Sequence, residues 1–90
     1  MKGGNVLPIL SNFYGIIIKM YFQQSEHNPP HIHAIYGEHV GVIDIQTGRM
    51  IEGDLPQRAI NLIREWVKKY KVDLMEIWES QNFKKIPPLK

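Results

Sequence analysis

The chain has 90 residues, with 11 Lys or Arg, 9 Asp or Glu and no cysteine. This length predicts one domain over residues 1–90 with a small core, and the absence of thiols excludes disulfides and cysteine chemistry. The longest apolar run, residues 16–18, is too short for a bilayer span, and residues 1–10 lack the apolar stretch of a secretory signal. We therefore expect a cytoplasmic protein with no membrane partner.

Residues 1–12 contain a Gly-Gly pair and a proline, and we expect them to be a loose lead-in. The sheet is predicted over residues 13–53. Within it, every second residue from Tyr14 to Phe22 is apolar or aromatic (Tyr, Ile, Ile, Met and Phe), so these side chains share one face, and the residues between them form a second, mixed face. This alternation is the pattern of a strand. A polar loop follows this strand and ends in Pro29-Pro30.

Two further strands are predicted at residues 31–36 and 39–46, because the Gly37-Glu38 pair between them suits a two-residue hairpin turn. A turn at Thr47-Gly48 then leads into a short strand at residues 49–52. The sheet is therefore expected to be antiparallel and to contain three to four strands.

Apolar side chains recur at helical spacing through residues 54–82, which predicts a helical segment. Asp54 is the expected N-cap, with Gln57 three residues further on. The pattern is interrupted at residues 71–73, so the segment is either one long helix or two short ones. Residues 83–90 form a basic tail without periodicity. The fold class is predicted to be α+β, with the small sheet packed against the C-terminal helices.

The most informative segment of the chain holds three of its four histidines, His27, His31 and His33, within seven positions. Imidazole binds transition metals, transfers protons near neutral pH and hydrogen-bonds to phosphate. The Pro29-Pro30 pair before the second and third histidines restricts the backbone and favours an extended approach. This segment can therefore present imidazoles in a defined geometry.

The predicted hairpin places His31 directly opposite Asp44. Opposed side chains of a sheet share a face and are close neighbours, so His31, His33 and Asp44 are expected on one face. Ile32 and Ile43 then lie on the other face, which is expected to pack on the helix. A register slip of one residue would reverse both assignments.

Three kinds of chemistry fit this face. The first is general acid/base catalysis, as in a hydrolase or ribonuclease; the second is metal binding; and the third is contact with phosphate. The candidate catalytic residues are His27, His31, His33 and Asp44. No fixed zinc motif, Gly-rich phosphate loop or nucleophilic serine motif occurs, so no metal or cofactor is assigned. In the plainer alternative, which stays open, Asp44 only satisfies the hydrogen-bonding needs of His31, and the cluster has a structural role.

Charge is distributed unevenly along the chain. From Arg58 onward there are eight basic and four acidic residues, whereas the rest is acidic by two. This asymmetry predicts a face for RNA or an acidic partner, and the candidate residues are Lys68, Lys69, Lys84 and Lys85. A solvated helix face is the alternative.

Four segments together resemble a small bacterial family that is catalogued only as a domain of unknown function. They are residues 13–22, residues 27–37 with their Pro-Pro-His-x-His core, residues 52–56, and the helical stretch from Trp66 to Trp78. The resemblance extends over residues 12–89. Glu26 stands where many relatives have Asp, and Ile32 where many have Phe.

This resemblance implies a gene beside that of a second small protein, forming a toxin–antitoxin pair in which this chain is the toxin. It singles out His27, His31 and His33 without giving them roles. We therefore expect a toxin that acts on RNA or translation and binds an antitoxin partner. A non-enzymatic binding module that works with its partner, and a small metal-binding protein, are the alternatives. Whether the chain is an enzyme stays open at this point.

Overall fold

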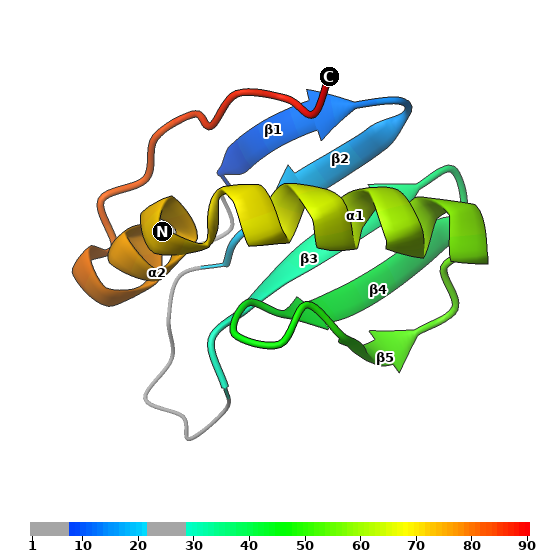
Figure 1. Cartoon of the computed structure of the whole chain (residues 1–90), viewed down its shortest axis with the longest axis horizontal. Helices are drawn as coiled ribbons and strands as arrows, with labels where there is room; N and C mark the ends of the chain where they lie inside the picture. Colours follow the sequence, from blue (N-terminus) through cyan, green and yellow to red (C-terminus); the bar gives the residue numbers. More distant parts are fainter. Residues whose placement is uncertain (1–7, 22–28) are drawn as a thin grey trace, which may run out of the picture.

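A computed structural model describes residues 8–21 and 29–90, which form one antiparallel sheet followed by two helices, the first of which lies across one face of the sheet (Figure 1). The strands lie in the sheet in chain order. They are β1 (Ile9–Phe13), β2 (Ile16–Lys19), β3 (His31–Tyr36), β4 (His39–Asp44) and β5 (Met50–Gly53). The helices α1 (Gln57–Lys69) and α2 (Lys71–Ser80) follow. The α+β class is confirmed, with five strands in place of the expected three to four.

Strand β1 lies, except for Phe13, within residues 1–12, which we expected to be a loose lead-in. Its pattern is hidden by an irregularity in pairing with β2, where the register shifts between Ile9 and Ser11. As a result Leu10 and Ser11 are both buried although they are consecutive, so the alternation typical of a strand is lost. The following strand begins at Ile16 because Tyr14 and Gly15 form the turn, with φ of 50° and 81°.

The hairpin of β3 and β4 has the predicted register. Tyr36 pairs with His39 and His31 pairs with Asp44, on either side of a turn in which Gly37 has a φ of 63°. Strand β4 ends at Asp44, two residues earlier than expected. The chain turns there because the Asp44 carboxylate accepts backbone N–H groups from the residues that follow it.

The expected N-cap at Asp54 is wrong, because α1 begins at Gln57 and its N-cap is Pro56. A residue that precedes proline is disfavoured in the helical region, so the helix starts only after Pro56. The Asp54 carboxylate instead lies 3.5 Å from the His39 imidazole. The interrupted pattern corresponds to two helices, which meet at Tyr70, a residue with φ −113° and ψ 25°.

The hydrophobic core lies on the face of the sheet that α1 covers, and the C-terminal segment completes it. Trp66 of α1 is fully buried, and its indole N–H donates a hydrogen bond of 2.9 Å to the Pro87 carbonyl. Ile86 and Leu89 are buried, and the Ile86 N–H donates to the Leu10 carbonyl at 2.7 Å. Residues 83–90 therefore run beside β1 as part of the core (Figure 1). In the described part of the chain, neither helix is long and apolar enough to cross a membrane.

Candidate functional site

His31 and His33 lie side by side on the face of the sheet that points away from the core. Their neighbours on β3, Ile32 and Ala34, are fully buried, whereas the two imidazoles are only partly covered. The two rings have centroids 5.2 Å apart and planes inclined at 66°. The predicted facing is therefore confirmed, and two imidazoles are close enough to act on one bound group.

The orientation of His31 is fixed by the residues before it. Its Nδ1 lies 2.9 Å from the Pro29 carbonyl oxygen. Because a carbonyl can only accept, Nδ1 carries the proton and Nε2 is left for other contacts. The indole of Trp78, from α2, lies on another side of the ring with centroids 5.1 Å apart. The Pro-Pro segment and α2 together hold this imidazole in place.

His33 has an altered affinity for protons. Its partial burial lowers the pKa of the imidazole below the ordinary value, the charge on His31 lowers it further, and Glu52 acts in the opposite direction. The ring also lies against Tyr21, with centroids 4.0 Å apart. His33 is therefore neutral at neutral pH and able to accept a proton.

Asp44 is the cross-strand neighbour of His31, as predicted, but its carboxylate is used elsewhere. Its Oδ1 accepts the N–H of Gln46 at 2.7 Å and the N–H of Thr47 at 3.2 Å. Among the residues that the structure describes, no hydrogen bond or ion pair joins Asp44 to His31. The geometry assigns Asp44 to the turn after β4.

The third histidine of the predicted cluster, His27, lies outside the described residues, as does Glu26. Across residues 8–21 and 29–90, no group of three or more His, Asp or Glu side chains is arranged to hold a metal ion. The structure therefore brings together two of the four candidate catalytic residues as a pair of rings, His31 and His33.

The four lysines predicted to contact RNA or a partner differ in their surroundings. Lys68 lines a cleft beside α1, whereas the Lys69 ammonium lies 5.5 Å from the centroid of the Tyr70 ring. Lys84 is 4.0 Å from the Asp73 carboxylate, and Lys85 is exposed.

Sequence reasoning missed two groups of neighbours. Tyr21 and Trp78 flank the imidazoles, although they come from different parts of the chain. Arg64 and Lys71 join Lys68 in the cleft. Only the second group left a signal in the sequence, because Arg64 and Lys68 are four residues apart on α1 and therefore lie on one side of that helix.

Comparison with known proteins identifies the family of this chain but no activity. Neither a curated protein nor a solved structure matches the chain. A family model does match residues 15–79, which include β2, the histidine pair and nearly all of α2. Its description is "Domain of unknown function (DUF4160)", and because the match covers more than half of the sequence, the chain belongs to the DUF4160 family.

Proposed function

We propose that this protein is the toxin of a bacterial toxin–antitoxin module and that it cleaves RNA with His31 and His33. The observation that supports the proposal is the pair of imidazoles with centroids 5.2 Å apart on the face of the sheet opposite α1, where both rings are only partly covered. General acid/base cleavage needs one neutral and one protonated group beside the scissile bond. The lowered pKa of His33 suits the neutral role.

The reaction can be written with these two side chains alone. Neutral His33 takes the proton of a ribose 2′-hydroxyl, and the 2′-oxygen attacks the adjacent phosphorus. The bond from phosphorus to the 5′-oxygen breaks, and that oxygen takes a proton from Nε2 of protonated His31. The products are a 2′,3′-cyclic phosphate and a free 5′-hydroxyl. The Pro29 carbonyl accepts from Nδ1 of His31, which leaves Nε2 as the nitrogen that can give up the transferred proton.

Two neighbours support binding of RNA at this face. Lys19 pairs with His33 across β2 and β3, so its side chain lies on the same face and offers a cation to the phosphate. Tyr21 has 43 % of its surface exposed beside His33 and offers a ring on which a base can stack. The face thus has an acid, a base, a cation and a stacking surface.

The test compares His31→Ala and His33→Ala with wild type in two assays: growth arrest on expression, and cleavage of end-labelled RNA by the purified chain. Loss of an acid or a base should lower the cleavage rate by about 10²–10⁴-fold and abolish arrest. His39→Ala is the matched control, because His39 lies at the other end of the hairpin. Thermal unfolding must stay close to wild type in all three variants. Histidine variants that stay folded and still arrest growth would refute the nuclease proposal.

A second candidate, a non-enzymatic module that acts through a partner protein, is favoured by the apolar character of the same face. Ile9, Tyr21 and Val40 expose between 40 % and 48 % of their surfaces there. Val40→Lys should then abolish a stable complex with the protein encoded beside it in a co-purification, while the histidine variants still bind. A wild-type chain that forms this complex but neither arrests growth nor cleaves RNA would favour this candidate over the nuclease.

A further inference from the structure

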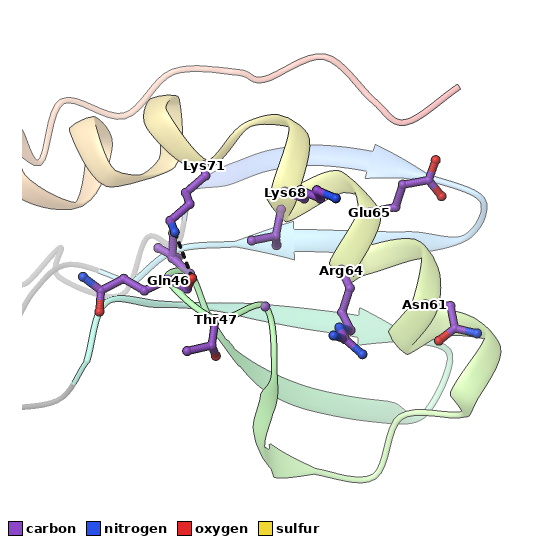
Figure 2. Close-up of a pocket in the computed structure, with 10 residues that line it drawn as sticks. Gln46, Thr47, Asn61, Arg64, Glu65, Lys68 and Lys71 are labelled. Carbon is purple, nitrogen blue, oxygen red and sulfur yellow. Dashed lines mark hydrogen bonds between the residues drawn. The ribbon is translucent and has the colours of Figure 1, made fainter.

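A cleft with a volume of about 440 Å³ lies between α1 and the turn that follows β4 (Figure 2). Gln46, Thr47 and Gly48 form the wall on the side of the turn. Side chains of α1, together with Lys71 at the start of α2, form the opposite wall. The volume falls within the range of small-molecule sites, so a ligand larger than a single ion fits.

Three cations and one carboxylate line this cleft. Arg64 and Lys68 are four residues apart on α1, and Lys71 follows three residues later. The acidic residue, Glu65, points away from the Gln46–Thr47 turn in Figure 2, whereas the Arg64 side chain extends towards that turn. The electrostatic potential of the cleft therefore favours an anion.

Most of the hydrogen-bond donors of these side chains are free. Within the described part of the chain, Arg64 and Lys68 have no ion pair or hydrogen bond. Lys71 uses one of its three N–H groups on the Gln46 carbonyl, at 3.0 Å. The Thr47 hydroxyl accepts the Arg49 N–H at 3.2 Å and keeps its own proton for donation. The cleft thus presents an excess of donors over acceptors.

The wall opposite α1 is held in place before any ligand binds. The Asp44 carboxylate fixes the N–H groups of Gln46 and Thr47, and the Gly48 N–H donates to the Asp44 carbonyl at 2.8 Å. Gly48 is buried with a φ of 76°, and a Cβ added there would lie 3.9 Å from Cγ of Arg64. The Arg64 stem therefore passes over Gly48 at van der Waals distance, which limits the positions of its guanidinium.

We propose that this cleft binds a phosphoryl group carried by a nucleotide or by a nucleic-acid backbone. Guanidinium and ammonium groups, together with a hydroxyl, are the donors that recognise phosphate oxygens, and the remaining volume admits the attached sugar. The site lies apart from the histidine pair and is independent of the proposed cleavage.

The test measures binding of two probes to the full chain by isothermal titration calorimetry. One probe is a nucleoside diphosphate, and the other is a short single-stranded RNA with 2′-O-methyl ribose, which the proposed cleavage reaction cannot cut. Arg64→Gln with Lys68→Gln removes two charges without breaking a described hydrogen bond. The double variant should bind at least about tenfold more weakly, because two charge-assisted hydrogen bonds to the phosphate are lost.

The matched control is Arg58→Gln with Lys90→Gln, which makes the same change in net charge at two exposed residues outside the cleft. It should bind close to the wild-type affinity. For the RNA probe, loss of two phosphate contacts should reduce the slope of log affinity against log salt by about 1.4. Binding of the diphosphate identifies a free nucleotide as a source, and binding of the RNA alone identifies the backbone. Absence of binding by both probes, or an equal loss in the control, would overturn the proposal.

Discussion

Asp44 faces His31 across the β3–β4 ladder, yet the two side chains bind different groups. The Asp44 Oδ1 accepts the N–H groups of Gln46 and Thr47 at 2.7 and 3.2 Å, whereas the His31 imidazole donates to the Pro29 carbonyl. The carboxylate therefore stabilises the turn that forms one wall of the cationic cleft. Two paired residues of the hairpin thus serve different parts of the structure: His31 belongs to the outer face, whereas Asp44 holds the turn whose residues line the cleft.

Asp44→Ala should lower the free energy of unfolding by about 1–2 kcal/mol, because two backbone N–H groups lose their acceptor. Asp44→Asn keeps an oxygen at the same position and should lose clearly less. Urea unfolding of the three proteins measures the difference. Equal losses in the two variants would show that the negative charge matters more than the hydrogen bonds to the turn.

Stability should depend on pH through His33. The pKa of this imidazole is lowered in the folded protein, chiefly by burial, so the unfolded chain binds a proton more readily. Stability should therefore be fully present above the ordinary histidine pKa and decline as the pH falls through the lowered pKa of the folded state. Urea unfolding between pH 5 and pH 8 measures this decline.

His33→Gln removes the titrating group and should flatten the dependence on pH, whereas His39→Gln should leave it in place. A His33→Gln variant with the same decline as wild type would assign the effect to another group.

The C-terminal segment should be needed for stability. Ile86→Ala should cost about 2–4 kcal/mol, since Ile86 is 4 % exposed and packs in the core. Lys90→Ala, at an exposed position in the same segment, should change stability by less than about 0.5 kcal/mol. Thermal unfolding of the two variants checks the contrast, and a small effect of Ile86→Ala would mean that this segment packs only loosely.

Gly41 should not tolerate a side chain while Leu55 is present. A Cβ at Gly41 would lie 2.5 Å from Cδ1 of Leu55, so Gly41→Ala should cost about 1–3 kcal/mol. Leu55→Ala removes the two closest atoms and leaves only Sδ of Met50, at 3.0 Å, so the double variant should lose less stability than the sum of the two single losses. Additive losses in a urea-unfolding cycle would show that the backbone shifts in response to the substitution.

The sequence predicted those parts of the fold that depend on local pattern. The Gly37-Glu38 turn determined the pairing of β3 with β4, and alternation along β3 determined which face carries His31 and His33. Strand β1 was missed because the irregular pairing near Ser11 removes the alternation. The start of α1 was misplaced because the effect of Pro56 outweighs the capping preference of Asp54.

The site was predictable only in part, for a related reason. Spacing along the chain shows that two imidazoles share a face, but it does not show that Asp44 binds backbone N–H groups. The contacts of Tyr21 and Trp78 with the imidazoles, and of Arg64 with the turn at Gly48, join elements that are distant in sequence. Such neighbours depend on how elements pack, which a single sequence does not encode in any short pattern.

The core of this small protein lies on one side of its sheet. Ile32, Ala34 and Ile43 on the inner face are fully buried, whereas the outer face carries the histidine pair and partly exposed apolar side chains. Folding therefore constrains alternate positions of β2, β3 and β4 and leaves the intervening positions of these strands tolerant of change. A scaffold of this kind can acquire a new specificity through outward-facing substitutions alone, at little risk to the stability of the protein.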